Sequence, residues 1–291
     1  TLYGEKSVLR LLNISDSMHD LDGLGFEKDI LGRFEDMLIG GEGIILVSGP
    51  TGSGKTTTLY STLNKMDKPD VNIVTIEDPI EFDLDNINQA QVNRRSGVTF
   101  ASALRAILRQ DPDIIMVGEV RDEETVELAI RAALTGHLVF STIHTNDSAA
   151  GFTRLLNWGM EPFLITSTVK GILAQRLVRR LCKECREKHM VEPKELTRFG
   201  LEVDEGMEFY KAVGCLSCRN TGYQGRVGLF ELIRMNNDIA DLVMQQQPGH
   251  IIREKAIESG MFSLIHDGLI KAQRGDTSLQ ELLETLGTDS L

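Results

Sequence analysis

One stretch of eight residues, from Gly49 to Thr56, limits the fold of this chain more than any other. It reads G-P-T-G-S-G-K-T, with glycines at its first, fourth and sixth positions and a lysine at its seventh. Glycines let the backbone close around a phosphate group, and the helix that follows adds the positive end of its dipole. An apolar segment at 44–48 and a helical pattern at 55–65 flank the stretch as that geometry requires. The pattern therefore predicts a nucleotide-binding loop between a strand and a helix of an α/β fold.

The same pattern predicts which residues contact the nucleotide. The Lys55 ammonium is expected to reach the β- and γ-phosphates, and the Thr56 hydroxyl to bind Mg²⁺. The predicted ATP-binding set is Gly49, Pro50, Thr51, Gly52, Ser53, Gly54, Lys55, Thr56 and Thr57.

Short apolar segments alternate with helical patterns through the first half of the chain. Such alternation indicates a parallel sheet with helices on its faces. Residues 146–175 also show a helical pattern, and apolar residues recur at helical spacing from residue 236 onward. The predicted strands are 44–48, 71–76, 113–117 and 138–142, and the predicted helices are 55–65, 99–109 and 122–134.

Acidic residues follow two of the predicted strands. Glu119 comes after the apolar run 114–117, and Asp78 and Glu81 come after the strand at 71–76. Because ligands of parallel sheets bind at the carboxyl ends of the strands, these carboxylates are predicted to lie beside the glycine-rich loop. Phosphoryl transfer to water needs a metal ion and an oriented water molecule. Helix caps and solvated turns are the alternative interpretation, and for Asp78 a turn is as good an explanation as a site.

Histidine and arginine residues are weaker candidates. His144 follows the strand at 138–142, where a sensor of the γ-phosphate could lie, although single histidines at strand ends are more often structural. A guanidinium stabilises the charge of a transferring phosphoryl group, in its own subunit or in a neighbour. The candidates are Arg10, Arg105, Arg109 and Arg121, each with an exposed or ion-paired side chain as the alternative.

The four cysteines form two C-x₂-C pairs, Cys182 with Cys185 and Cys215 with Cys218. Two such pairs supply four thiolates in the tetrahedral arrangement that Zn²⁺ favours. Four thiolates complete the coordination of a zinc ion and leave no position open for a substrate, so the predicted zinc site is structural. Unligated thiols are the main alternative, and disulfides are disfavoured because the chain shows no export signal.

Length and charge limit the remaining possibilities. The 291 residues are enough for about two domains. The net charge of −12 argues against broad electrostatic binding of nucleic acid, although Arg176 and neighbouring basic residues could form a local patch. No apolar run approaches the ~18 residues of a membrane-spanning helix. The chain begins with Thr1 rather than Met, so we expect a further region upstream.

Taken together, these motifs resemble the secretion ATPases that drive type II secretion and type IV pilus assembly. The resemblance extends from Val8 to Glu281 and rests on the glycine-rich loop, an "aspartate box" at 76–81, the segment 107–113 leading into 119–122, a "histidine box" at 135–145 and the four cysteines. Pilus-retraction ATPases resemble the chain elsewhere but lack the cysteine region.

The resemblance implies a fold and a set of residue roles. It implies a RecA-like α/β core, with Glu119 as the metal-site glutamate, Glu81 as the water activator and His144 as the phosphate sensor. Arg10 would approach the nucleotide from a preceding domain, and Arg154 and Arg226 join the arginines that the family keeps, some at subunit contacts. The implied domains are the tail of an upstream domain (1–13), the ATPase core (14–175), a tetracysteine zinc subdomain (176–230) and a helical C-terminal subdomain (231–291).

The resemblance also implies a homo-hexameric ring with nucleotide near the subunit boundaries. The ring would act in the cytoplasm at the inner-membrane face, through platform proteins rather than by direct membrane insertion, and without nucleic acid. Its cofactors would be ATP, Mg²⁺ and Zn²⁺.

Four alternatives to this function stay open at the level of sequence. A RecA-like nucleic-acid motor and a conjugation-type secretion ATPase would use the same core, and a scaffold would bind nucleotide without hydrolysing it. A GTP-binding switch is suggested by Asn64-Lys65-Met66-Asp67, which matches N-K-x-D. However, these residues end the helix that begins at Lys55, too early to reach a guanine base.

Overall fold

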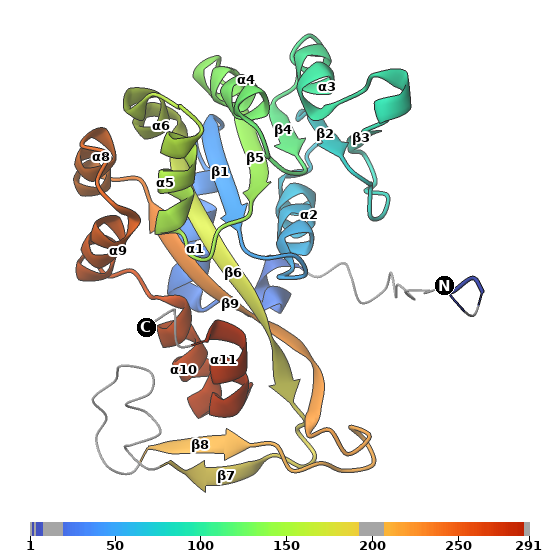
Figure 1. Cartoon of the computed structure of the whole chain (residues 1–291), viewed down its shortest axis with the longest axis vertical. Coiled ribbons are helices and arrows are strands. Elements are labelled where there is room, and N and C mark those ends of the chain that lie inside the picture. Colours follow the sequence, from blue (N-terminus) through green and yellow to red (C-terminus); the bar gives the residue numbers. More distant parts are fainter. Residues whose placement is uncertain (1, 3, 8–19, 192–206, 288–291) are drawn as a thin grey trace.

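The computed structural model of this chain describes residues 2, 4–7, 20–191 and 207–287 (Figure 1). Arg10 and most of the expected upstream tail at 1–13 lie outside the described residues. The elements in chain order are η2 (Leu21–Leu24), α1 (Lys28–Leu38), β1 (Gly43–Ser48), α2 (Lys55–Met66), β2 (Ile73–Glu77), β3 (Asn88–Gln91), η3 (Arg94–Ser96), α3 (Phe100–Ile107), β4 (Ile114–Val117), α4 (Glu123–Leu134), β5 (Leu138–Ile143), α5 (Ala149–Asn157), α6 (Pro162–Thr168), β6 (Val169–Leu181), β7 (Glu187–Met190), β8 (Glu208–Lys211), β9 (Tyr223–Arg234), α8 (Asn237–Met244), α9 (Gly249–Glu258), α10 (Leu264–Arg274) and α11 (Leu279–Leu286).

A seven-stranded mixed sheet forms the centre of the molecule, in the order β3-β2-β4-β5-β1-β6-β9. Its strands pair in parallel except β9, which runs antiparallel to β6. Every residue of β1, β4 and β5 is buried, because helices cover both faces of the sheet. Alternate residues of β1 serve the two faces: Ile44 and Leu46 pack toward α4 and α5, whereas Ile45 and Val47 pack toward α1 and α2.

The strands β6 and β9 are longer than the others and extend beyond the main sheet (Figure 1). Their far ends pack against α10, α11 and β8 around a third apolar core that includes Val178, Phe209 and Leu282. Next to it, β7 and β8 form a separate two-stranded sheet. The domain boundaries expected at 175/176 and 230/231 therefore fall inside β6 and β9, so both strands belong to the main sheet as well as to the cysteine region.

The helical prediction for residues 146–175 is wrong in its last part. Helix α6 ends at Thr168, and β6 begins at Val169 with no intervening turn. Because no glycine or proline separates the two elements, the sequence carries no sign of the change. The other predicted strands and helices are confirmed with shifts of one or two residues at their ends.

The order of strands brings the carboxyl ends of β2, β4, β5 and β1 to one edge. In the pairing of β1 with β6, Ser48 lies beside Ala174. The next residues of β6, Gln175 and Arg176, therefore run past the end of β1 and alongside the glycine-rich loop. Among the described helices, none is both long and apolar enough to span a membrane.

Candidate functional site

The glycine-rich loop, residues 49–54, joins β1 to α2. Gly49 has φ +148° and Gly54 has φ +88°, conformations that residues with a Cβ rarely adopt. A Cβ at Gly49 would lie 2.5 Å from Gln175 O, and one at Gly54 would lie 2.7 Å from Gln175 Nε2. Gln175 in turn accepts a hydrogen bond from Thr58 Oγ1 at 2.7 Å. The loop is therefore held closely against β6 by contacts that only glycine allows.

Lys55 begins α2 and is buried, with 8% of its surface exposed. Its ammonium donates to Gly49 O at 2.8 Å and to Pro50 O at 3.0 Å, so the side chain folds back over the loop. The pKa of Lys55 is lowered, mainly by burial. The charge of Glu119 acts to raise this pKa, and the charge of Arg176 acts to lower it further. Thr56 and Thr57 follow on α2 and are half-buried.

Glu119 and His144, predicted from two different strand ends, meet in the structure. Glu119 Oε2 lies 3.4 Å from His144 Nε2 and 2.5 Å from Arg121 Nε. The Glu119 side chain is 13% exposed, whereas those of His144 and Arg121 are largely exposed. The charge of Glu119 also acts to raise the pKa of Lys55, so the carboxylate that contacts His144 is electrostatically coupled to the lysine of the glycine-rich loop.

The two glutamates that end and follow β2 have different surroundings. Glu81 is exposed, and its backbone N–H donates to Tyr60 Oη at 3.3 Å. Glu77 is buried and accepts hydrogen bonds from Tyr60 Oη, from Thr75 Oγ1 at 2.6 Å and from Gln89 Nε2 at 3.0 Å. Burial and the Glu77 contact raise the pKa of Tyr60. Sequence reasoning singled out Glu81 and passed over Glu77, although Glu77 is the last residue of an apolar strand.

The arginine candidates are spread over the surface. Arg105 on α3 forms an exposed ion pair with Glu124 at 2.5 Å, and Arg109 is exposed just after the end of that helix. Sequence reasoning placed Arg176 only in a basic patch, whereas the structure sets it beside the glycine-rich loop. Its guanidinium donates to Asn146 O at 2.7 Å and to Gln175 O at 3.1 Å. The register of β6 against β1 could have suggested this, but the sequence did not reveal that β6 was a strand.

The four cysteines come together although 33 residues separate Cys182 from Cys215. The sulfur atoms lie within 4.8 Å of one another, with Cys182–Cys215 at 3.9 Å and Cys185–Cys218 at 3.8 Å. Four thiolates about 2.3 Å from one tetrahedral zinc ion would have sulfur atoms roughly 3.8 Å apart. Burial acts to raise the pKa of Cys218, but N–H donation from Cys215 and Gly222 outweighs it and brings that pKa to about 6. The cluster fits a zinc ion, and the cysteines are not joined by disulfides.

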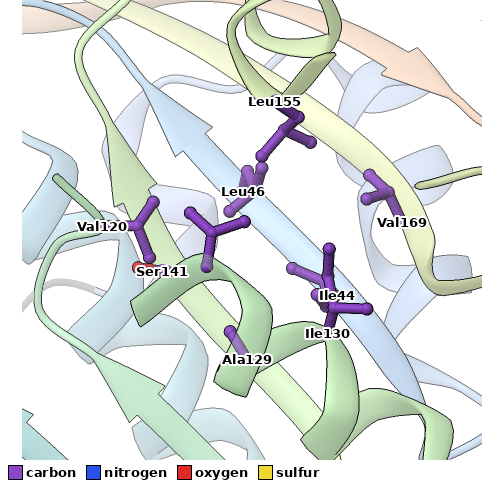
Figure 2. Close-up of a pocket in the computed structure, with 9 residues that line it drawn as sticks. Ile44, Leu46, Val120, Ala129, Ile130, Ser141, Leu155 and Val169 are labelled. Atoms are coloured by element: carbon purple, nitrogen blue, oxygen red, sulfur yellow. The ribbon is translucent and has the colours of Figure 1, made fainter. Parts of the chain in front are cut away.

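An apolar pocket lies between the sheet and the helices α4 and α5 (Figure 2). Its walls are aliphatic except for Ser141, whose hydroxyl donates to Val117 O at 2.7 Å. A pocket without charged groups cannot hold a polyphosphate, so it belongs to the packing of the core. Its lining residues are Ile44, Leu46, Val120, Val126, Ala129, Ile130, Ser141, Leu155 and Val169.

Comparison with known proteins gives one consistent result. The profile of a family described as "Type II/IV secretion system protein" matches residues 1–284. The chain is 46% identical over 281 residues to the type II secretion system ATPase E of Vibrio cholerae, covering 97% of this chain and 56% of that protein. It is 47% identical over 285 residues to the type IV pilus assembly ATPase PilB of Thermus thermophilus, covering 97% of this chain and 32% of that protein.

A solved structure agrees with these relatives. The crystal structure of the pilus retraction motor PilT with bound ADP superposes with a TM-score of 0.68 at 29% identity, covering 92% of this chain and 66% of that chain. The chain spans between about a third and somewhat more than half of the length of the two relatives named above. The match of the family profile over residues 1–284 and of relatives well above 30% identity shows that this chain belongs to the type II/IV secretion system protein family.

Proposed function

We propose that this chain contains the ATP-hydrolysing part of a motor that powers type II protein secretion or type IV pilus assembly. Relatives named for both systems match it about equally well. The observation that carries the proposal is the contact of Glu119 with His144 at the carboxyl edge of the sheet, where the charge of Glu119 also acts on the buried Lys55 of the glycine-rich loop. A RecA-like ATPase core with an attached zinc subdomain is the finer description of the fold that we propose.

The residues at this edge have complementary tasks. The backbone N–H groups of residues 49–56 would surround the phosphates, and the Lys55 ammonium would exchange its carbonyl contacts for phosphate oxygens. Thr56 and Glu119 would hold Mg²⁺, which supplies positive charge against the transferring phosphoryl group. We propose that Glu81 accepts the proton of the attacking water and that His144 contacts the terminal phosphate, so that its position differs between ATP and ADP.

The assembly follows from the same proposal. We infer a homo-hexameric ring at the cytoplasmic face of the inner membrane, bound to platform proteins of the secretion or pilus system. Head-to-tail contacts close such a ring, and the exposed Arg105 and Arg109 are available to a neighbouring subunit. The net charge of −12 favours this function over a nucleic-acid motor, which needs a basic surface.

The decisive experiment is steady-state phosphate release from ATP with Mg²⁺. We expect the purified chain to release phosphate and Glu119→Gln to lose about 100-fold or more of that rate, because the metal site loses a charge. Glu127→Gln is the matched control, since Glu127 pairs with Arg131 on the exposed face of α4. An assembled wild-type protein that binds ATP without releasing phosphate would leave only a scaffold function.

The zinc site has an independent test. We propose that Cys182, Cys185, Cys215 and Cys218 bind one Zn²⁺ that stabilises the region at the far ends of β6 and β9. Metal analysis of the purified protein is expected to return about one zinc per chain, and chelation to lower the melting temperature. A metal-free protein with an unchanged melting temperature would contradict the assignment.

A further inference from the structure

Glu231, near the carboxyl end of β9, is a fully buried carboxylate outside the residues that surround the glycine-rich loop. In the pairing of β9 with β6, Glu231 lies beside Ala174. Arg176 follows Ala174 by two residues in β6. Burial of a carboxylate is costly unless its oxygens receive hydrogen bonds or face a positive charge. The groups that face Glu231 therefore indicate what it is needed for.

These groups come from three segments that are distant in the sequence. Glu231 Oε1 accepts hydrogen bonds from Ser148 N at 3.0 Å and from the Ser148 hydroxyl. Glu231 Oε2 accepts one from Leu264 N, the first residue of α10, at 3.3 Å, and lies 3.9 Å from Arg253 Nε of α9. One carboxylate thus joins the start of α5 to two helices of the C-terminal region.

Ser148 ends a short segment, residues 144–148, that we call the His144 loop. Its middle is held by Arg176, whose guanidinium donates to Asn146 O at 2.7 Å. Asp147 O accepts hydrogen bonds from Ser48 Oγ at 3.4 Å and from Thr145 Oγ1 at 3.0 Å. The His144 loop is therefore attached on one side to the strand that leads into the glycine-rich loop and on the other to Glu231.

Arg176 completes the link. Its charge lowers the pKa of Lys55, and the charge of Glu231 counteracts the lowering of the Arg176 pKa by burial. Glu231 thus acts on the His144 loop twice, directly through Ser148 and indirectly through the charge of Arg176.

We propose that Glu231 is a positioning residue that fixes the His144 loop against the C-terminal helices, so that His144 can distinguish ATP from ADP. This inference rests on the proposed function, because it assigns a cause to the placement of the proposed phosphate sensor. Small displacements of a group that contacts the reacting phosphate reduce rates by up to about 100-fold. Release of the loop therefore changes the response to the terminal phosphate and leaves the binding of the other phosphates to the glycine-rich loop.

The test compares two variants, Glu231→Gln and Ser148→Ala, in the whole chain. Binding of ADP and of a non-hydrolysable ATP analogue is measured by calorimetry, and kcat and KM by phosphate release. For Glu231→Gln we expect an ADP affinity within about 3-fold of wild type and a kcat lower by about 10-fold or more, with the preference for the analogue over ADP lost. Ser148→Ala keeps the backbone hydrogen bond, so it should show the same pattern with a smaller loss.

Glu281→Gln is the matched control. Glu281 is also buried, and it joins β6 to α11 by accepting hydrogen bonds from Arg179 N at 2.8 Å and Arg179 Nε at 2.5 Å. This variant should lower the melting temperature without changing the preference for the analogue over ADP. If Glu231→Gln only lowers the melting temperature in the same way, Glu231 is merely structural and the inference is wrong.

The outcomes separate the inference from the proposed function. A wild-type protein that binds neither nucleotide overturns both the inference and the proposed function. If the wild type is active and both variants, Ser148→Ala and Glu231→Gln, keep its nucleotide preference and its kcat, only the inference is overturned. Should Glu231→Gln fail to fold, Ser148→Ala decides, because it leaves the buried carboxylate in place.

Discussion

Two lysines are buried in the described part of this chain, and their surroundings differ sharply. Lys271 on α10 is fully buried, and its ammonium donates to Asp267 Oδ2 at 2.5 Å and to Gly228 O at 2.8 Å. Lys55 on α2 donates only to the carbonyl oxygens of Gly49 and Pro50, and no carboxylate of the described residues forms an ion pair with it. Burial lowers the pKa of both lysines.

The difference separates a lysine that is paired with a carboxylate inside the protein from a lysine that we propose to bind phosphate. The charge of Lys271 is neutralised inside the protein, so removing it leaves Asp267 buried without a partner. The charge of Lys55 is held by neutral backbone atoms at the edge of the sheet, where it remains available to an anion. A bound phosphate would raise the pKa of Lys55, because it adds the negative charge that the protein does not supply.

The largest effect on stability is expected for Lys271→Met. A buried ion pair that loses one member typically costs about 3–5 kcal/mol, because the other charge stays buried. Burial already raises the pKa of Asp267 against the attraction of Lys271, so this carboxyl is expected to take up a proton when the lysine is gone. Urea unfolding at neutral pH measures the loss in the free energy of unfolding.

The double variant Asp267→Asn with Lys271→Met serves as the control. It removes the unpaired charge and keeps an oxygen that can accept the hydrogen bond from Phe230 N, which lies 2.8 Å from Asp267 Oδ2. We expect it to recover part of the stability that the single variant loses. A single variant that unfolds like wild type would show that the pair contributes nothing, and the contrast between the lysines would lose its basis.

Lys55→Met is expected to lower the rate of phosphate release strongly and the free energy of unfolding only slightly, the opposite of Lys271→Met. The rate of phosphate release should fall by about 100- to 1,000-fold, since a preorganised charge on the transferring group is lost. The free energy of unfolding without nucleotide should stay within about 1 kcal/mol of wild type, because no ion pair is broken. Steady-state phosphate release and urea unfolding give the two numbers.

Lys65→Met on the same helix is the matched control. Lys65 forms an exposed ion pair with Glu35, so its loss should change neither the rate nor the stability appreciably. A strongly destabilised Lys55→Met would indicate that Lys55 holds the loop together in the absence of nucleotide.

The two lysines also show what the sequence can predict. Lys55 could be identified because its neighbours form a local pattern with one known purpose, and Glu119 and His144 because they follow apolar strands. Lys271 could not, because its partner Asp267 is visible as a helical i,i+4 pair but the burial of that pair depends on β9. Local sequence patterns do not contain such contacts between distant segments.

The strand β6 illustrates the same limit at the level of the fold. Ile172, Leu173 and Ala174 are consecutive and all buried, because they contact three different apolar cores. A strand buried on both faces has no alternation, so its pattern is as compatible with a helix as with a strand. Since β6 was not predicted, neither Arg176 nor Glu231 could be placed near the site, although the residues at the ends of β4 and β5 could.

A smaller effect distinguishes the backbone at the two sites. Gly54, directly before Lys55, has φ +88°, and Gly275, which ends the helix α10 that carries Lys271, has φ +79°. Alanine at either position should cost about 1–3 kcal/mol of stability, because the left-handed conformation is strained for a residue with a Cβ. Only Gly54→Ala should also weaken ADP binding, since its Cβ would press on Gln175 and shift the loop. Calorimetry with ADP on both variants tests this, and equal affinities would mean that the loop adapts to the added methyl group.

Arg105 carries an exposed charge, and its removal is expected to have the smallest effect on stability. Its ion pair with Glu124 is exposed on both sides, so Arg105→Ala and Glu124→Ala should each change the free energy of unfolding by less than about 1 kcal/mol. If Arg105 contacts the nucleotide of a neighbouring subunit in the ring, as the sequence suggests, only Arg105→Ala should lower phosphate release by the assembled protein. Equal rates for the two variants would assign Arg105 to the surface, and the cations at the nucleotide would then come from its own subunit alone, with Lys55 and Arg176 as the candidates beside the glycine-rich loop.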